Sequence, residues 1–290
     1  MPVPLVENAP AKVNLTLRVL GRRADGYHEI LSLVAFADFG DRLSFTPGGE
    51  LMLTVHGPSA AQAGQSADNL VLKAARALAE RVPDIVLGKF DLEKDLPVAA
   101  GIGGGSTDAA AALRLLARAN DLAGDDPRLP EAARATGADV PVCLDPRPRM
   151  MHGIGEKLSG PLVLPPLHAV LVNPGIALAT KDVFAGCTPA AHPLAPFDLT
   201  APAKNREQFL QSLAGQANDL EDAAINLAPV IADVLGALRA LAGCRLARMS
   251  GSGATCFGLF DSAAAARSAA ETLSNKYPQW WVRACGLGSG

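Results

Sequence analysis

Hydrophobic and polar residues alternate between residues 11 and 20 of this chain. The apolar side chains are Val13, Leu15, Leu17 and Val19, and the polar ones between them are Lys12, Asn14, Thr16 and Arg18. A period of two predicts a strand with one apolar and one polar face. Lys12 lies on the polar face, where a solvated lysine is the ordinary expectation.

The rest of the first half mixes strands and helices. Strands are predicted at residues 42–45 and 51–55, a helix is predicted from residue 69 onward, and further helices are predicted at 106–120 and 130–136. The first of these helices has Asp68 as its candidate N-cap, and the last is closed by Gly137. A glycine-rich loop precedes the middle helix, whose alanines and leucines favour helix.

The second half also contains both strands and helices, and the local composition changes near residue 148. Strands are predicted at residues 169–173, 255–260 and 281–285, and helices at 206–214, 227–242 and 262–276. A chain of 290 residues suggests two domains at about 150 residues each. We therefore predict two α+β domains, residues 1–155 and 156–290.

Composition and charge exclude several classes of protein. Hydrophobic residues make up 49% and charged residues 19%, which argues against disorder, and no apolar run approaches the length of a membrane span. The net charge of −3 offers no positive excess to hold a nucleic-acid backbone. The first residues show neither a basic nor an apolar leader region, so the expected location is the cytoplasm.

The five cysteines predict neither disulfides nor a zinc site. They are Cys143, Cys187, Cys244, Cys256 and Cys285. Their number is odd, and no CxxC pair or histidine cluster accompanies them. They are therefore predicted to be reduced residues of the core.

The strongest local signal is the segment GIGGGST at residues 101–107, just before a predicted helix. Glycines let backbone approach a phosphate closely, and a helix start offers free amides and a positive dipole end. The alternative is a flexible loop whose Ser106 or Thr107 merely caps the helix. The spacing fits neither a Walker A loop nor a dinucleotide-binding fingerprint, because no GxxxxGK[ST] is present and Ser106 replaces the last glycine of GxGxxG.

The other candidate residues each allow both a structural and a functional interpretation when taken alone. Two further glycine clusters, residues 152–156 and 249–255, are typical of tight turns but could converge with the first on one ligand. Asp139, in GADVP, fits an Asx turn. Tyr27 and His28 follow a polar segment where no core requires an aromatic ring, so they suit either recognition of a flat heterocycle or a structural staple.

Five segments in order resemble the GHMP kinases. They are PAKVNL at residues 10–15, ADGYH at 24–28, PVAAGIGGGST at 97–107, GADVP at 137–141 and GSGATCF at 251–257. The resemblance covers residues 10–260. It implies an N-terminal, ATP-binding domain like domain 2 of ribosomal protein S5, with a left-handed β-α-β crossover, and a ferredoxin-like C-terminal domain. ATP and substrate would bind in the cleft between them.

The resemblance also implies site residues. The ATP phosphates would be wrapped by Pro97, Val98, Ala99, Ala100, Gly101, Ile102, Gly103, Gly104, Gly105, Ser106 and Thr107. Asn69 and Lys94 would lie near the adenine. Substrate would be bound by Asn14, Tyr27, His28, Phe184, Gly251, Ser252 and Gly253. Among these residues, Tyr27 and Phe184 would sandwich a cytosine, and His28 would contact its edge.

The implied reaction moves the γ-phosphoryl group of ATP to a hydroxyl group of a cytidine-diphosphate-linked methylerythritol, in non-mevalonate isoprenoid synthesis. Asp139 would take the hydroxyl proton and Lys12 would orient it. Mg²⁺ would bridge the ATP oxygens, with Ser106 as a possible ligand. Val142 and Cys143 depart from the aromatic pair common after DVP in this family.

Three alternatives remain open from the sequence. The chain could be a homoserine or mevalonate type of GHMP kinase, or the related decarboxylase, although those enzymes have no cytosine to stack on Tyr27. A non-catalytic RNA-binding module like protein S5 is a third, which the net charge of −3 opposes.

Overall fold

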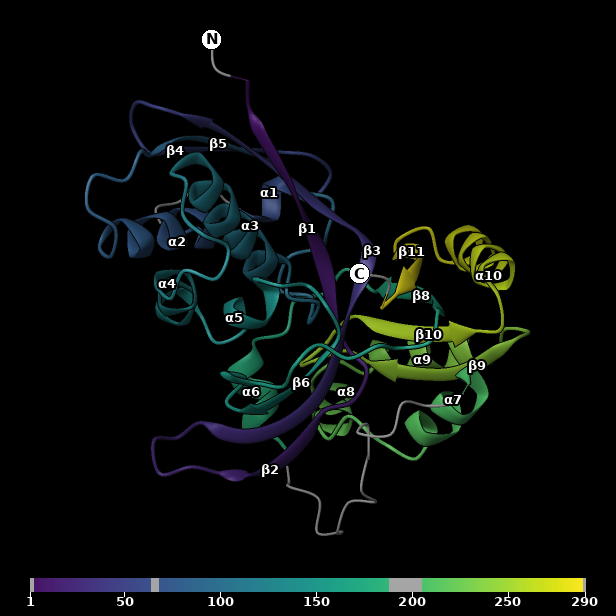
Figure 1. Ribbon diagram of the computed structural model, residues 1–290. Helices are drawn as coiled ribbons and strands as arrows, with labels where there is room; N and C mark the ends of the chain where they lie inside the picture. Colours follow the sequence, from purple (N-terminus) through teal and green to yellow (C-terminus); the bar gives the residue numbers. More distant parts are fainter. Residues whose placement is uncertain (1–2, 64–67, 188–204, 289–290) are drawn as a thin grey trace. The chain divides into compact units, whose positions relative to one another are not determined.

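The computed structural model describes residues 3–63, 68–187 and 205–288. These residues form two compact units (Figure 1). Unit 1 comprises Met1–Lys12, Phe39–Val98 and Gly103–Pro146, and unit 2 comprises Val13–Asp38, Ala99–Ile102 and Arg147–Gly290. Strands β1 (Leu5–Asn14) and β3 (His28–Pro47) each begin in one unit and end in the other. Because compact units follow contacts rather than sequence order, the domain boundary between residues 155 and 156 stays a prediction.

Unit 1 combines a small sheet with a group of helices. Strand β5 (Gly88–Glu93) pairs antiparallel with the end of β3 and parallel with β4 (Met52–His56). Helix α2 (Leu70–Ala79) lies between β4 and β5 in the sequence, which makes a parallel β-α-β unit, and its left-handed crossover stays a prediction. Figure 1 shows α2 beside α3 (Gly104–Ala119) and α4 (Arg128–Thr136). The short helices α1 (Ala60–Ala63) and α5 (Val140–Cys143) complete the unit.

The core of unit 1 follows from its sequence patterns. Phe45 on β3 and Phe90 on β5 are fully buried, and their ring centroids lie 4.6 Å apart. Residues 109–112 on α3 are all buried alanines, whose small side chains let α2 pack closely. This packing fixes the start of α3, where the glycine-rich loop ends.

The N-terminal part of unit 2 is built around the beginning of β3. Strand β2 (Arg18–Arg22) pairs with β3 at residues 28–31, and β6 (Arg149–Gly153) pairs with β3 at residues 30–34. Strand β7 (Lys157–Leu158) pairs with β6. The glycine cluster at residues 152–156 forms the tight turn between β6 and β7, where the Glu156 carboxylate accepts the Ile154 N–H at 2.6 Å. This cluster therefore has the structural role of a turn.

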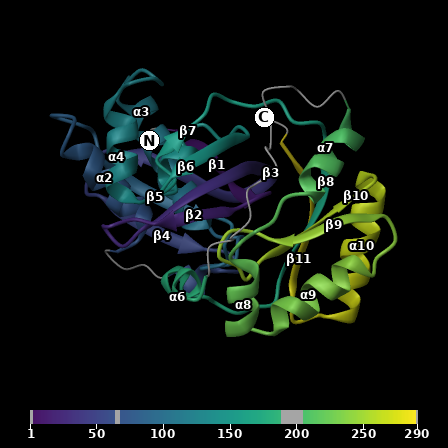
Figure 2. The same ribbon diagram turned by 90° about the horizontal axis from the view of Figure 1, so that it is seen from below.

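The C-terminal part of unit 2 is an antiparallel sheet in the order β11-β8-β10-β9. Its strands are β8 (Leu167–Asn173), β9 (Cys244–Met249), β10 (Cys256–Phe260) and β11 (Trp281–Leu287). Helices α9 (Val230–Arg239) and α10 (Ala263–Lys276) pack against this sheet, as Figure 2 shows. The succession β8-α9-β9-β10-α10-β11 confirms the ferredoxin-like prediction. Helices α6 (Thr180–Ala185), α7 (Arg206–Ala214) and α8 (Glu221–Leu227) lie between β8 and α9 in the sequence.

Several predicted elements have other bounds in the structure, and three of these differences have a clear physical reason. The first strand was expected to run to residue 20, but β1 ends at Asn14 and β2 begins at Arg18, because each pairs separately with β3. The N-cap of α2 is Asn69 rather than Asp68, since the Asn69 side chain accepts the Val71 N–H. The helix predicted at residues 227–242 is the shorter α9, with Pro229 as its N-cap.

The cysteines carry free thiols, but not all are core residues. Cys143, Cys256 and Cys285 are buried, as expected, whereas Cys187 and Cys244 are half-buried. Burial raises the pKa of the Cys143 thiol to about 12, which keeps it protonated at neutral pH. Within the described part of the chain, no helix has both the length and the apolar character needed to cross a membrane.

Candidate active site

Lys12 and Asp139 form an ion pair within unit 1, although 127 positions separate them in the sequence. Lys12 Nζ lies 3.0 Å from Asp139 Oδ2. The two side chains differ sharply in exposure, at 4% for Lys12 and 42% for Asp139. The buried lysine is thus fixed in place, while the carboxylate that it contacts remains open to a ligand.

Local packing explains how Asp139 is presented. It is the N-cap residue of α5, but its side chain makes no capping hydrogen bond, so the Asx-turn alternative is wrong. Behind it, Val142 and Cys143 are buried, and the Cys143 thiol donates to the Asp139 carbonyl oxygen at 3.1 Å. These smaller side chains therefore fill the space behind Asp139 in place of the aromatic pair.

The start of helix α3 lies against Lys12. Gly103 is its N-cap, with φ +65°, and a Cβ there would lie 3.1 Å from both Cβ and Cε of Lys12. Because Gly103 has no side chain, it does not cap the first-turn amides of α3, and such amides are suited to bind an anion. Thr107 Oγ1 donates to the Gly104 carbonyl, so Thr107 does not cap the helix. These contacts favour the phosphate-binding interpretation over an ordinary capped turn.

The remainder of the loop belongs to both units. Pro97, Val98 and residues 103–107 lie in unit 1, whereas Ala99–Ile102 lie in unit 2. Ala99 and Gly101 have φ of 51° and 74°. For an alanine this conformation costs about 1–2 kcal/mol, which the contacts of the loop must offset. Ala100 accepts the Thr255 N–H at 3.1 Å, and Ile102 is fully buried.

Within unit 2, the loop between β9 and β10 contacts Gly101 closely and forms a hydrogen bond with it. Ser250 Oγ donates to the Gly101 carbonyl and accepts the Asn14 N–H, each at 3.0 Å. A Cβ at Gly251 would lie 2.8 Å from the Gly101 oxygen, so glycine is required at this close approach. Two of the segments that carry the resemblance are therefore joined through Ser250, which lies in the glycine cluster at residues 249–255 but was not predicted as a site residue.

Ser250→Ala is expected to destabilise the protein by about 1–3 kcal/mol, because it leaves the buried Asn14 N–H and the Gly101 carbonyl without this partner. The midpoint of urea unfolding, compared with wild type at an unchanged slope, measures the loss. An unchanged midpoint would show that water or a neighbouring group replaces the hydroxyl.

Ser252 and Gly253 belong to this loop, and Asn14 contacts it through Ser250. The Asn14 side chain is buried and donates to Ser32 Oγ at 2.7 Å. Ser252 Oγ lies 3.0 Å from Thr180 Oγ1, at the start of α6. Asn218, which no sequence pattern marked, donates to the carbonyls of Met249 and Gly251. These residues fix the loop backbone, and their contact with substrate stays a prediction.

The predicted aromatic residues also lie in unit 2. Tyr27 follows the turn between β2 and β3 and is 59% exposed, as expected for a ring that no core requires. His28 stacks on Phe184 of α6, with ring centroids 5.0 Å apart and an interplanar angle of 27°. The structure therefore brings His28 and Phe184 together and leaves the Tyr27 ring available to a ligand.

Of the residues expected near adenine, Asn69 caps α2, and Lys94 is almost fully buried in unit 1. The Lys94 ammonium contacts the carboxylates of Asp41 and Asp108. Sequence reasoning missed both partners, although Asp108 is the single acidic residue of α3 and follows directly on the glycine-rich loop. Burial raises the pKa of Asp108 to about 8, against the lowering effect of Lys94.

The described part of the site offers oxygen ligands for Mg²⁺ only in combination with a nucleotide. Among the described residues, no group of three or more histidine, cysteine or acidic side chains is placed to hold a metal ion alone. Mg²⁺ in kinases is held mainly by nucleotide phosphates with one or two protein oxygens, and hydroxyl and carboxylate oxygens are the ligands it prefers. Ser106 and Asp139 offer such oxygens, so the residues fit a nucleotide-borne Mg²⁺.

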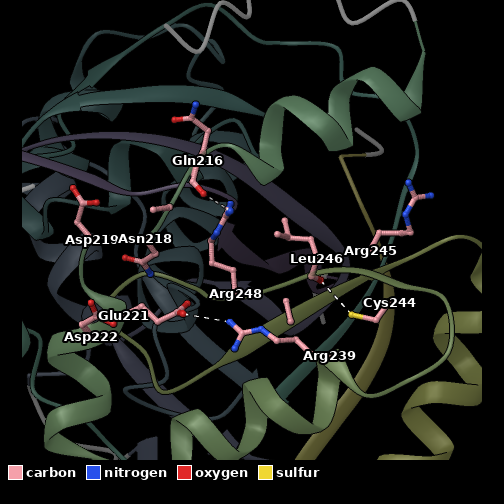
Figure 3. A pocket seen from close by; sticks show the side chains of 12 residues that line it. Gln216, Asn218, Asp219, Glu221, Asp222, Arg239, Cys244, Arg245, Leu246 and Arg248 are labelled. Carbon is pink, nitrogen blue, oxygen red and sulfur yellow. Dashed lines mark hydrogen bonds and ion pairs between the residues drawn. The ribbon is translucent and has the colours of Figure 1, made fainter. Parts of the chain in front are cut away.

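A cavity of about 720 Å³ in unit 2 includes none of the predicted site residues. It lies between the segment before α8 and strand β9, and charged side chains line it (Figure 3). Arg239 pairs with Glu221 at 3.6 Å, and Arg245 pairs with Asp261 at 2.8 Å. Arg248 donates to the carbonyls of residues 15, 213 and 216. These basic groups are therefore already engaged within the protein.

Two family models match the chain. The N-terminal domain model of the GHMP kinases matches residues 69–145, and the C-terminal model matches residues 200–279. Together they cover more than half of the chain.

Full-length relatives are similar throughout. A 4-diphosphocytidyl-2-C-methyl-D-erythritol kinase of Rhodopseudomonas palustris is 60% identical, over 98% of this chain and 97% of the relative. The enzyme of that name from Bradyrhizobium diazoefficiens is 56% identical, over 98% of each chain. A crystal structure of 4-(cytidine 5'-diphospho)-2C-methyl-D-erythritol kinase is 37% identical, with a TM-score of 0.81, over 99% of this chain and 100% of that one. A homoserine kinase from Cytophaga hutchinsonii is 19% identical with a TM-score of 0.74, over 100% of this chain and 97% of that one, and shows the shared fold.

Proposed function

The chain belongs to the GHMP kinases, and we propose from its site that it phosphorylates the 2-hydroxyl group of 4-diphosphocytidyl-2-C-methyl-D-erythritol. The products are the 2-phosphate and ADP, and the reaction belongs to non-mevalonate isoprenoid precursor synthesis. Relatives at 56–60% identity over nearly the whole chain carry this activity in their name. The homoserine and mevalonate kinases are 19% and 16% identical, so those alternatives are not favoured.

One observation carries the catalytic proposal: an exposed carboxylate, Asp139, held by a buried lysine beside the start of α3. A hydroxyl group is a weak nucleophile, and a positioned carboxylate can accept its proton as the oxygen bonds to the γ-phosphorus. The bond from that phosphorus to the ADP oxygen breaks in the same step. Lys12 keeps the Asp139 carboxylate oriented and adds positive charge where phosphoryl oxygens accumulate negative charge.

The nucleotide is proposed to bind along residues 97–107. The amides at the start of α3 and the positive end of its dipole suit the phosphates of ATP. Asn69 and Lys94 belong to the proposal as residues near the adenine. When bound, Mg²⁺ would screen the phosphate charges, with Ser106 as a possible ligand.

Substrate recognition is assigned to the aromatic residues of unit 2. Tyr27 offers an exposed ring for stacking on cytosine, Phe184 is the proposed opposite wall, and His28 is proposed to contact the edge of the base. Asn14, Gly251, Ser252 and Gly253 are proposed to hold the methylerythritol end. Relatives that phosphorylate acceptors without a base have no use for such rings, so these residues support a cytidyl substrate.

The reaction can be tested by the release of ADP in a coupled assay. The cytidyl substrate, homoserine and mevalonate are supplied separately with ATP and Mg²⁺. ADP release is expected with the cytidyl substrate but not with homoserine or mevalonate. Turnover with either of these two would contradict the assignment. A cytoplasmic location and the lack of a nucleic-acid partner, both expected from sequence, are part of the proposal.

Tyr27→Ala is expected to raise KM for the cytidyl substrate about tenfold to a hundredfold, because stacking of a base on an aromatic ring is worth about 1–3 kcal/mol. KM for ATP should stay within twofold, since Tyr27 is not part of the phosphate loop. Steady-state kinetics with each substrate varied in turn measures both values.

The matched control for this variant is Leu20→Ala, an exposed side chain on the neighbouring strand β2. It should leave both KM values unchanged. Equal weakening of ATP and cytidyl substrate by Tyr27→Ala would contradict the stacking assignment.

A further inference from the structure

Three ionisable side chains are buried together in unit 1, and two of them, Asp41 and Asp108, have no role in the mechanism above. Lys94 Nζ donates to Asp41 Oδ2, and to Asp108 Oδ2 at 2.7 Å. The side chains of Lys94, Asp41 and Asp108 are 3%, 0% and 4% exposed. Removing one partner of a buried ion pair leaves an uncompensated charge, so this triad is a strong mutual constraint on the segments that carry it.

The three members join the two ends of the glycine-rich loop. Asp41 Oδ1 accepts the N–H groups of Asp95 and Leu96 at 2.7 and 2.8 Å, and these residues directly precede the loop. Asp108 follows the last loop residue, in the second turn of α3. One ammonium group therefore links strand β3, the chain that enters the loop and the helix that follows it.

The triad also contacts the first turn of α3. A Cβ at Gly104 would lie 3.1 Å from Lys94 Nζ and 3.6 Å from Leu96 Cβ. The ammonium group therefore lies directly against the backbone whose amides are proposed to bind phosphate. A small shift of that backbone would change where the amide donors point.

We propose that Asp41 and Asp108 are positioning residues for ATP, which act through Lys94 to hold both ends of residues 97–107 in their phosphate-binding geometry. The proposal rests on the proposed use of ATP by this site. Donors that bind a phosphoryl group must be held before the ligand arrives, and a misplacement of about 1 Å can reduce catalysis about a hundredfold. Asp108 Oδ1 is buried without a hydrogen-bond partner among the described residues, so the hydrogen bond of Asp108 within the triad is the one that Oδ2 accepts from Lys94.

The test compares Asp41→Asn, Asp108→Ala and Asp108→Asn with wild type. Calorimetric titration with ATP, together with KM for each substrate, is measured at a temperature where unfolding curves show each variant folded. Asp41→Asn and Asp108→Ala are expected to weaken ATP binding at least tenfold and to change KM for the cytidyl substrate less than threefold. Asp108→Asn keeps an oxygen that accepts from Lys94, and it should bind ATP within about threefold of wild type. Asp41→Asn cannot keep all its contacts, because one Asp41 oxygen accepts from Lys94 and the other from the N–H groups of Asp95 and Leu96, so its amide nitrogen must face one of these donors.

Glu7→Gln is the matched control, because Glu7 pairs with Arg114 and Arg118 and so ties α3 to β1 far from the loop. It should lower the unfolding midpoint and leave ATP affinity unchanged. A weakening of ATP binding by Glu7→Gln as large as that by Asp41→Asn would overturn the proposal, since any loosening of α3 would then suffice.

Each remaining outcome decides the matter. ATP affinity within twofold of wild type in folded Asp41→Asn or Asp108→Ala overturns the positioning role. If one of these two variants fails to fold, the other decides. If neither folds, the triad is required for unit 1 itself and the proposal is overturned. Wild-type protein that does not bind ATP would instead refute the proposed function, and the variants would not be needed to show it.

Discussion

Asp139→Asn is expected to bind ATP and the cytidyl substrate normally while kcat falls by about 10² to 10⁴. Asparagine has nearly the shape of aspartate but cannot accept the hydroxyl proton, and loss of a general base typically has an effect of this size. The Asp139 side chain is 42% exposed and caps no helix, but it neutralises the buried Lys12 ammonium, so a moderate loss of stability should accompany the substitution. The comparison is therefore made at a temperature where unfolding curves show the variant folded. A loss confined to kcat therefore separates chemistry from binding.

The measurement is kcat with saturating ATP, Mg²⁺ and cytidyl substrate, with ATP affinity determined by calorimetry. Asp125→Asn, at an exposed position before α4, is the control and should retain wild-type kcat. Near wild-type turnover in Asp139→Asn would refute the base assignment. Phosphoryl transfer would then proceed through a loose transition state in which positioning and charge dominate.

Lys12→Met tests whether the pair acts as a unit. Methionine keeps much of the side-chain length against Gly103 but removes the charge that orients Asp139. If Lys12 acts through Asp139, the double variant should be little worse in kcat than the worse single variant. Multiplication of the two single effects would show that Lys12 and Asp139 contribute independently.

Gly103→Ala is expected to reduce kcat/KM for ATP by about a hundredfold, because an added methyl group would meet Lys12 at 3.1 Å and the backbone would keep a φ of +65°. The left-handed conformation by itself costs an alanine about 1–2 kcal/mol, so a moderate loss of stability should accompany the effect. Two elements of the site would move together: the first-turn amides of α3 and the lysine that holds Asp139.

Gly124→Ala is the matched control for this substitution. Gly124 has ordinary φ and nothing within 4 Å of its missing Cβ, so alanine there should leave kinetics and stability unchanged. Steady-state kinetics and thermal unfolding of both variants supply the comparison. A folded Gly103→Ala enzyme with wild-type kcat/KM would mean that the loop adapts freely, and the phosphate-binding role of residues 97–107 would lose its main support.

The sequence predicted the elements whose signals are local. Helix α7 has the predicted bounds, and β10 and α10 each begin one residue later than expected, because periodicity, capping residues and turns act over a few positions. Short or interrupted elements such as β7 and α8 carry too little periodic signal, and sequence reasoning missed them.

In the candidate site, too, the residue types follow from local sequence, whereas their partners follow from the tertiary structure. The sequence by itself determined which residues offer chemistry: the glycine loop, Lys12, Asp139 and the aromatic pair at Tyr27 and His28 each belong to a short recognisable segment. These residues are marked by type and spacing, which the chain carries without being folded.

Only the tertiary structure decided which of those groups have partners. Three of the hydrogen bonds join residues that lie far apart in the sequence. Lys12 donates to Asp139 over a separation of 127 positions, the Asn14 N–H to Ser250 over 236, and Lys94 to Asp41 over 53. None of these partners is specified by local propensity, because each contact depends on the path of the whole chain and on the burial that makes an unpaired charge or amide unfavourable. Lys94, which is proposed to lie near the adenine, is also the centre of a buried triad, because a buried ammonium needs opposite charge close at hand.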